Sequence, residues 1–469
     1  MQKYYKTILR QIFSGKNVLK VMNKISLISI ATLFSGIASL SAQESEVWTL
    51  NSCIDYAIKN NIELQQSRIM HEQSGIDVKT AKADMFPSLS FTTGHNVVNR
   101  PFSENSNTVS GSEVISSNQK TTYNGSYGIN ANWVVWNGNK RRNQIKQNKH
   151  NYEIAGLNVD EAENMLKEQI TQLYIQILYA TEAVKINENT LEVSKATLSR
   201  GEELYRVGSL SKVDLAQLET EVANDEYQLV MSKNALRNYK LDLKQLLEIP
   251  GTTPMELQIL ELDESDVLSP LPSQNDIFVA ALQSRPEIKS GQLNIEASKL
   301  DISIAKSGYY PTISLNASTA SNTNSASAYN WGEQMKLGWN NMIGVNLSLP
   351  IYDKRQNKSA KQKAELQHNS VQMQMQIIEK ELYQSIETMW LEADNAQQQY
   401  IVASSKVKSS KTSYDMINEQ FTLGMKNIVE LLTEKNNYLS AQQEVLQAKY
   451  MAILERVLLN FYAGQPIEL

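Results

Sequence analysis

Histidines are the side chains best suited to bind a metal or move a proton at neutral pH, and this sequence has four of them. They are His71, His95, His150 and His368, and none has a second histidine at metal-ligand spacing. A single cysteine, Cys53, allows neither a disulfide framework nor a cysteine-rich zinc site. We therefore expect solvated or hydrogen-bonded histidines, a buried Cys53 on a short helix, and neither metal nor cofactor.

Catalytic motifs are absent as well. The sequence has no glycine-rich phosphate loop, no nucleophile elbow and no zinc-binding helix motif. Its acidic residues fall mostly on predicted solvated helix faces. We therefore expect no enzyme activity. An envelope hydrolase is a third functional alternative, after the two given at the end of this subsection, and loss of turnover on substitution of single acids would support it.

The overall charge argues against nucleic acid as a partner. The chain has 45 Lys and Arg against 50 Asp and Glu, a net charge of −5, so no basic field exists to attract DNA or RNA.

Residues 1–42 read as a targeting segment. Lys24 precedes the apolar run Ile25 to Leu40, and small residues up to Ala42 provide a cleavage site before Gln43. Met22 stands just ahead of this signal, so either Met1 or Met22 could be the start. We expect an exported protein without a lipid anchor, since no cysteine follows the cleavage point.

The stretch from Asn139 to Pro250 predicts one long helical hairpin. Apolar residues at steps of four, three or seven form a coiled-coil seam on its first arm: Leu166, Ile170, Leu173, Ile177, Ala180, Val184, Leu191 and Leu198. Gly208 can adopt the left-handed backbone that ends the arm. The second arm begins near Asp214 and repeats every seven residues: Leu215, Val222, Leu229, Leu236 and Leu243. The first arm would measure on the order of 100 Å.

A second hairpin follows, with Gly424 lying 216 residues after Gly208. Its first arm runs from Lys354 to Phe421. Its returning arm carries two apolar stripes, one from Val429 to Val457 and one from Leu431 to Leu459, about 200° apart around the helix. Neighbours on both sides fit a closed ring of helices, although an ordinary four-helix bundle core remains the alternative.

Each hairpin is preceded by short helices and two predicted strands. The strands of the first copy are Ser88 to Val98 and Tyr123 to Trp136, separated by a predicted loop from Asn99 to Thr122. Met342 to Tyr352 is the last strand, with apolar and polar residues alternating. Aromatic residues near the strand ends suit a membrane-interface girdle and equally suit a soluble sheet. The predicted domains are 43–250 and 274–469, joined by a linker over 251–273.

This duplicated order resembles the TolC family of outer-membrane channel proteins. The resemblance rests on the paired strand entries Phe86-Pro87 and Tyr310-Pro311 and on the paired tips Val207-Gly208 and Leu423-Gly424. It implies an α plus transmembrane β-barrel fold. Three chains would share a 12-stranded β-barrel continuous with a long periplasmic α-helical coiled-coil barrel. It also implies an outer-membrane location and a passive efflux or type I secretion duct, working with a periplasmic adaptor and an inner-membrane pump.

The resemblance also assigns site residues. In the family an aromatic, a basic residue and carboxylates hold the periplasmic entrance shut, and the matching positions here are Phe421, Lys426, Glu430, Thr433 and Asp214. Thr433 departs from the family's second acid, which weakens the case for strong cation selectivity. Lys426 and Glu430 can also be an ordinary exposed pair four residues apart. The adaptor would dock on the tips, at Val207, Gly208, Leu423 and Gly424.

A periplasmic coiled-coil spacer or adhesin without a pore is the alternative function. It accounts for the heptads and the signal, but it gives no reason for the paired strands. Neither the exported substrate nor the pump class follows from the sequence.

Overall fold

The computed structural model describes residues 47–102, 106–110, 113–117, 120–259 and 264–468. The predicted signal sequence, residues 1–42, lies outside them. Two compact units are present. In the smaller one Trp48 forms an isolated parallel bridge with Leu257, and the amide of Trp48 donates to the carbonyl of Glu256 at 2.8 Å.

The larger unit contains the same series of helices twice. The first series is α3 (Leu50–Asn60), α4 (Ile62–Ala83), α5 (Lys140–Arg206) and α6 (Lys212–Leu246). The second is α8 (Gln274–Ser284), α9 (Pro286–Ser307), α11 (Gln356–Thr422) and α12 (Ile428–Tyr462). Corresponding helices have identical lengths of 11, 22, 67 and 35 residues. A short helix, α7 (Glu264–Val267), precedes the second series.

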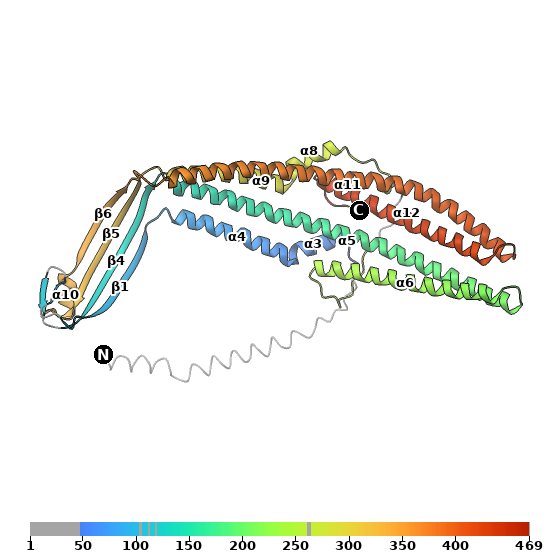
Figure 1. Cartoon of the computed structure of the whole chain (residues 1–469), viewed down its shortest axis with the longest axis horizontal. Helices are drawn as coiled ribbons and strands as arrows, with labels where there is room; N and C mark the ends of the chain where they lie inside the picture. The colour runs from blue at the N-terminus through green and yellow to red at the C-terminus, as the bar shows by residue number, and fades with distance from the viewer. Residues whose placement is uncertain (1–46, 103–105, 111–112, 118–119, 260–263, 469) are drawn as a thin grey trace, which may run out of the picture. The chain divides into compact units, whose positions relative to one another are not determined.

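Two helical hairpins result, α5 with α6 and α11 with α12 (Figure 1). Both turn through a glycine in the left-handed region, with φ of 79° at Gly208 and 74° at Gly424. The following amides close the turns, Ser209 donating to Leu204 and Met425 to Gln420, each at 2.9 Å. The predicted reversal at both glycines is confirmed.

The predicted seams are largely confirmed by burial. On α5, six of the eight seam residues are buried and Leu173 and Leu198 are half-buried. On α6 only Leu243 of the heptad leucines and valine is fully buried. The far half of α12 is buried on both predicted stripes, at Ala452 and Leu459 as well as Ile453 and Val457, whereas Val429 near the tip is exposed.

The strands form one antiparallel sheet in the order β1 (Ser88–Asn99), β4 (Thr121–Asn137), β5 (Thr312–Asn324) and β6 (Asn340–Ser348). β1 and β6 are therefore its edges. The strand predicted to reach Tyr352 ends at Ser348, because Pro350 lacks an amide hydrogen and restricts Leu349.

The connections between strands differ from expectation. The segment predicted as a loop from Asn99 to Thr122 contains a two-stranded hairpin, β2 (Ser106–Ser110) with β3 (Glu113–Ser117). Its register aligns Thr108 with Ile115 and Val109 with Val114. In the second copy a short helix, α10 (Trp331–Leu337), stands between β5 and β6.

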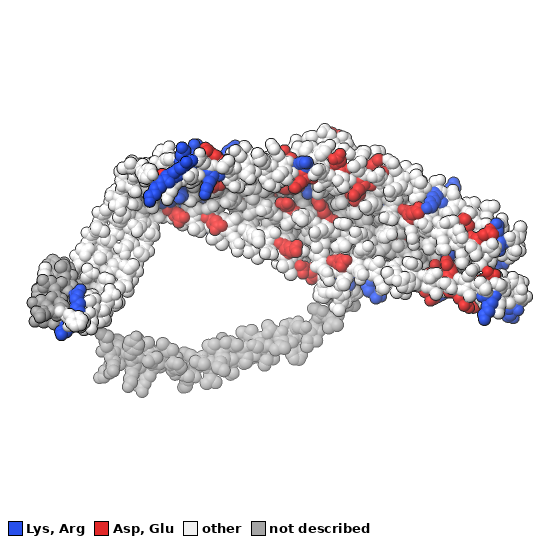
Figure 2. All heavy atoms as spheres, in the orientation of Figure 1, with Lys and Arg blue, Asp and Glu red and all other residues white. Residues whose placement is uncertain are grey.

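The two faces of the four-stranded sheet differ in polarity. Strand register places alternating apolar residues in rows across one face, for example Trp133, Leu315 and Val345. On β6 these apolar side chains are widely exposed in the single chain, with Ile343 at 79% and Val345 at 68%, whereas Leu315 of β5 is half-buried. The opposite face carries mainly Asn, Ser, Thr and Gly, and none of the four strands contains Lys, Arg, Asp or Glu. Figure 2 shows the sheet as a zone without charge colours.

No helix within the described ranges is long and apolar enough to cross a membrane.

Candidate functional site

The two hairpin tips are built alike. Ser211 caps α6 by accepting the amide of Asp214 at 3.1 Å, and Asn427 caps α12 by accepting the amide of Glu430 at 2.9 Å. Asp214 and Glu430 thus occupy the same position of their helices, where a negative charge stabilises the helix N-terminus. Their equivalent positions follow the equal spacing from Gly208 and Gly424, and their role at an entrance stays a prediction.

Each acid bonds within its own tip. The Ser211 hydroxyl donates to Asp214 Oδ2 at 2.8 Å, and the Asn427 amide donates to Glu430 Oε1 at 3.0 Å. Lys426 forms a close ion pair with Glu430 Oε2. Thr433, at the position of the family's second acid, is exposed and donates its hydroxyl to the carbonyl of Val429.

Phe421 lies apart from this polar group. Its side chain is 4% exposed and packs in a cluster with Leu218 of α6 and with Ile428 and Leu431 of α12. We call these four residues the tip cluster. Phe421 therefore joins the two hairpins of one chain. Lys426 pairs with Glu430, whereas Asp214 bonds to Ser211 and Thr433 to the backbone of Val429, each within its own hairpin.

The residues predicted for docking lie at the ends of the hairpins. Val207 is 67% and Leu423 73% exposed, and a methyl group added at Gly208 or Gly424 would meet no described atom within 4 Å. Both tips thus present an apolar side chain beside an open glycine.

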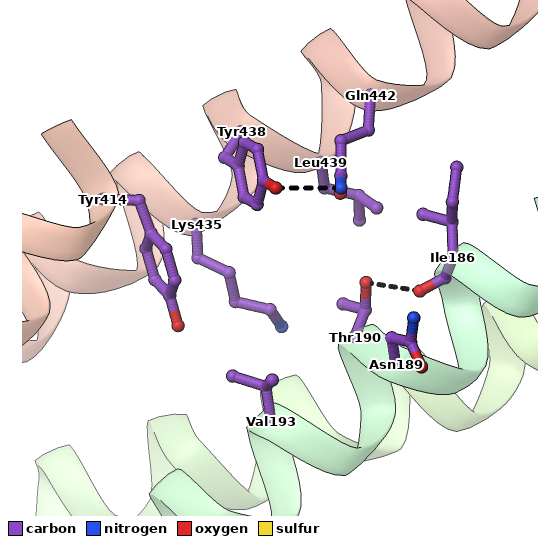
Figure 3. A pocket seen from close by; sticks show the side chains of 9 residues that line it. All are labelled: Ile186, Asn189, Thr190, Val193, Tyr414, Lys435, Tyr438, Leu439 and Gln442. Atoms are coloured by element: carbon purple, nitrogen blue, oxygen red, sulfur yellow. Dashed lines mark hydrogen bonds between the residues drawn. The ribbon is translucent and has the colours of Figure 1, made fainter. Parts of the chain in front are cut away.

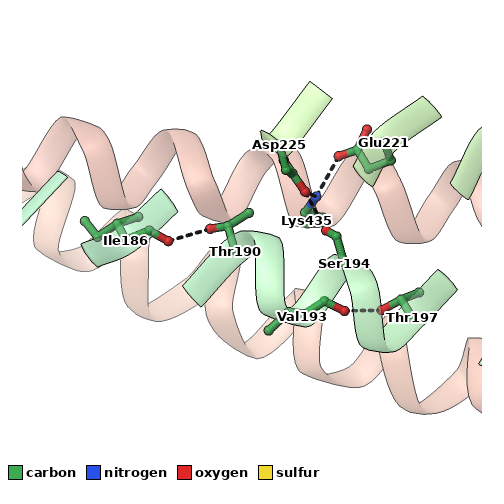
Figure 4. A network of polar contacts seen from close by, with 8 residues as sticks. All are labelled: Ile186, Thr190, Val193, Ser194, Thr197, Glu221, Asp225 and Lys435. Atoms are coloured by element: carbon green, nitrogen blue, oxygen red, sulfur yellow. Dashed lines mark hydrogen bonds and ion pairs between the residues drawn. The ribbon is translucent and has the colours of Figure 1, made fainter. Parts of the chain in front are cut away.

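A buried ionic network, not foreseen from the sequence, crosses between the hairpins (Figure 4). Lys435 of α12 bonds to Glu221 Oε1 at 2.7 Å and to Asp225 Oδ2 of α6, and Ser194 of α5 donates to the same Asp225 oxygen. The side chains of Lys435 and Asp225 are 9% and 7% exposed. A buried cation with two carboxylates costs desolvation that only close pairing offsets, so this network depends on all its members.

A signal for the network was present in the sequence. Asp225 follows the buried Leu218 by seven residues and Lys435 follows the buried Leu431 by four, so each charge stands at a seam position. A charge at a seam position predicts a buried partner. The partners lie 210 residues apart, and only the folded chain identifies them.

A cavity of about 250 Å³ adjoins Lys435 (Figure 3). Tyr414 and Tyr438 stack on one side with ring centroids 6.0 Å apart. Residues of α5 form the other wall: Ile186, Asn189, Thr190 and Val193. The hairpins are therefore less tightly packed just beyond the ionic network.

The residues considered for chemistry stay apart. Cys53 is fully buried, which raises the pKa of its thiol to about 12. His71 stacks on Tyr152, His95 bonds to Thr93 and Tyr123, and His368 bonds to Ser298. Across the residues that the structure describes, no three His, Cys, Asp or Glu side chains gather as a metal site would require.

One buried acid makes stability depend on pH. Glu455 of α12 is 5% exposed and its Oε2 has no hydrogen-bond partner among the described residues. Burial, with a smaller effect of Glu392, raises its pKa from 4.5 to about 7. The folded state therefore binds the proton of the Glu455 carboxyl more tightly than the unfolded state does. The contribution of protonated Glu455 to stability is full below pH 4.5 and is lost as pH rises to about 7.

The variant Glu455→Gln is expected to lose this pH dependence. Above pH 7 it should be more stable than the wild type by on the order of 3 kcal/mol, since one pKa unit corresponds to about 1.4 kcal/mol. Thermal melting of the detergent-extracted protein across this pH range measures the difference between the two. Parallel curves for wild type and variant would contradict the assignment, and Glu381→Gln, which changes an exposed glutamate of α11, is the control.

Comparison with known proteins agrees with this geometry. The family model described as "Outer membrane efflux protein" matches residues 53–248 and 278–465. The outer membrane efflux protein BepC of Brucella suis is 21% identical over 436 residues, covering 92% of this chain and 89% of BepC. The outer membrane protein TolC of Salmonella enteritidis is 21% identical over 455 residues, covering 94% of this chain and 86% of TolC.

Solved structures share the fold. A crystal structure of CusC has a TM-score of 0.76 at 16% identity, covering 89% of this chain and 92% of that chain. VceC of Vibrio cholerae has a TM-score of 0.74 at 15% identity, covering 89% of this chain and 97% of that chain. The chain belongs to the outer membrane efflux protein family and is an outer-membrane protein whose helical part lies in the periplasm.

Proposed function

We propose that three copies of this chain form a passive exit duct through the outer membrane, with a shared 12-stranded barrel above a periplasmic tunnel of helices. The observation that carries the proposal is the four-stranded sheet, which combines an exposed apolar face with two unpaired edges. Apolar side chains on one face and uncharged polar ones on the other suit strands between lipid and a water-filled lumen.

The edges argue for assembly. In lipid every backbone amide and carbonyl needs a partner, so β1 and β6 cannot remain free edges. Since the four strands are antiparallel, β6 of one copy would pair antiparallel with β1 of the next. Four strands are too few to close around a pore, and the family resemblance supplies the number of three chains.

The tips would be the docking point for a periplasmic adaptor, which connects the duct to an inner-membrane pump. The exposed Val207 and Leu423 beside the open Gly208 and Gly424 offer two similar apolar contacts per chain. The duct itself would be passive, with the energy for export coming from the pump.

The tips would also form the closed entrance. Three Lys426–Glu430 pairs around one axis would set its charge, and the tip cluster would hold Phe421 behind them. Lys426→Glu breaks the pair and adds three carboxylates to the ring, so like charges repel. We expect a larger single-channel conductance.

The measurement is ion current across a planar bilayer after addition of the detergent-extracted trimer. Lys408→Glu, which changes an exposed lysine about four helical turns before the tip in the same way, should conduct like the wild type. Equal conductance of Lys426→Glu and wild type would argue against an entrance at this position. A water-soluble monomer would overturn the duct as a whole and favour the spacer.

A further inference from the structure

A dense group of cations lies where the sheet passes into the long helices. Residues 140–149 and 354–363, which follow β4 and β6, contain ten Lys and Arg and no Asp or Glu, in a protein whose net charge is −5. We call these ten residues the basic patch: Lys140, Arg141, Arg142, Lys146, Lys149, Lys354, Arg355, Lys358, Lys361 and Lys363. Figure 2 shows Lys and Arg gathering at this end of the helices, next to the uncharged sheet.

The position of the basic patch opposes the helix dipole. The N-terminus of a helix carries a partial positive charge and favours acids in its first turn. Neither α5 nor α11 has an acid in its first turn, whereas α4, α6, α9 and α12 each have one. At α11 the carboxylate of Asp353, just before the helix, accepts the amide of Asn357 at 2.7 Å, but α5 has no such acid. The cations at the N-terminus of α5 in particular destabilise the isolated chain, so an external anion would relieve a repulsion already built into it.

The cations are also poorly neutralised within the chain. Among the described residues only Lys361 makes an ion pair, with Glu365 at 3.3 Å. Arg141 donates to the backbone carbonyl of Asp84 and Arg355 to Gln362. Arg142, Lys146 and Lys149 are exposed and stand on one face of α5, at spacings of four and three.

The surroundings fit a membrane interface. Trp136 packs edge-on against Tyr310 at the end of the sheet, and Ile351 and Tyr352, just before Lys354, are 96% and 85% exposed. Aromatic rings and long cationic side chains together are typical of the headgroup layer, where the rings lie among the headgroups and the cations reach phosphates.

We propose that the basic patch binds the phosphate groups of anionic phospholipids in the periplasmic leaflet of the outer membrane. The proposal rests on the placement of the sheet in the bilayer, and it adds a lipid-binding surface that fixes the depth of the protein in the membrane. The exposed apolar sheet face would meet the acyl chains, and the basic patch would meet the adjoining headgroups. A Lys or Arg near an anionic surface contributes about fivefold to binding.

The test is the melting temperature of the detergent-extracted full-length protein in micelles containing phosphatidylglycerol or, separately, phosphatidylcholine. A ligand that binds the folded state raises the melting temperature by mass action. We expect a rise with phosphatidylglycerol only, and a smaller rise at higher salt. In Arg142→Gln/Lys146→Gln/Lys358→Gln the apparent affinity for phosphatidylglycerol should fall at least tenfold, up to on the order of a hundredfold.

The matched control is Lys185→Gln/Lys408→Gln/Lys411→Gln, which removes three exposed lysines from the same helices outside the basic patch. It should keep the full response to phosphatidylglycerol. An equal rise with inorganic phosphate, or an unchanged response in the patch variant, would overturn the proposal. A third result would also overturn it: no response to lipid in the wild type, together with an anion preference of the pore that is lost in the patch variant. The cations would then line the lumen. If the protein responded to lipid but passed no ion current, lipid binding by the basic patch would be supported and the proposed duct would be contradicted.

Discussion

Lys435→Met is expected to separate the two hairpins of each chain near their tips and to lower stability by about 3 to 5 kcal/mol. Methionine keeps the length and apolar stem of lysine but leaves the buried Asp225 without its cation and Glu221 without its hydrogen bond. Asp225 keeps its hydrogen bond from Ser194 but loses its counter-ion. A buried charge without a counter-ion must be hydrated, and separation of α6 from α12 admits the water. Hydrogen exchange of the amides of α6 and α12 measures the opening.

Two controls separate burial from charge. Lys233→Met breaks a comparable pair with Glu188, but both side chains are about half exposed, so the cost should be below 1 kcal/mol. Combining Lys435→Met with Asp225→Leu and Glu221→Leu removes the uncompensated charges together and should restore most of the stability. If Lys435→Met behaved like Lys233→Met, the network would not hold the hairpins.

The network and the tip cluster make the two hairpins one unit near their tips. Lys435 lies one helical turn beyond Leu431, and Asp225 two turns beyond Leu218, so the ionic contact follows directly on the apolar one. A proposed entrance that widens by moving one hairpin against the other would have to break both. The cavity beside Tyr414 lies farther from the tips than the tip cluster and the ionic network, and there the hairpins are less tightly packed.

What could be predicted from the sequence is the local and periodic part of this arrangement. The turns at Gly208 and Gly424 could be predicted because each turn needs positive φ at a single residue, which glycine adopts readily. Lys426 and Glu430 could be paired because four residues are one helical turn. The seam of α5 follows from its spacing alone.

What could not be predicted depends on contacts distant in sequence. Nothing local in Lys435 identifies Asp225 as its partner, and the heptad pattern was read for its apolar members only. Phe421 was assigned to the entrance by resemblance, yet its burial against Leu218 depends on how the hairpins pack. The β2–β3 hairpin was missed because its segment is rich in Ser, Asn and Gly, which favour a loop, and contains few β-branched residues to indicate strands.

Phe421→Ala is the substitution that decides what this side chain does. Removal of an aromatic ring that is 4% exposed should cost about 3 to 5 kcal/mol and leave a hole between Leu218, Ile428 and Leu431. Phe421→Leu keeps most of the apolar volume and should cost less than about 1.5 kcal/mol, and Leu423→Ala, which truncates an exposed neighbour, about 0.5 kcal/mol or less. If Phe421 acts by packing, amide exchange at the ends of α6 and α12 and single-channel conductance should rise together in Phe421→Ala and change little in the other two. A rise in conductance without faster exchange would instead place the ring in the entrance itself, because the hairpins would then have stayed together while the obstruction was lost.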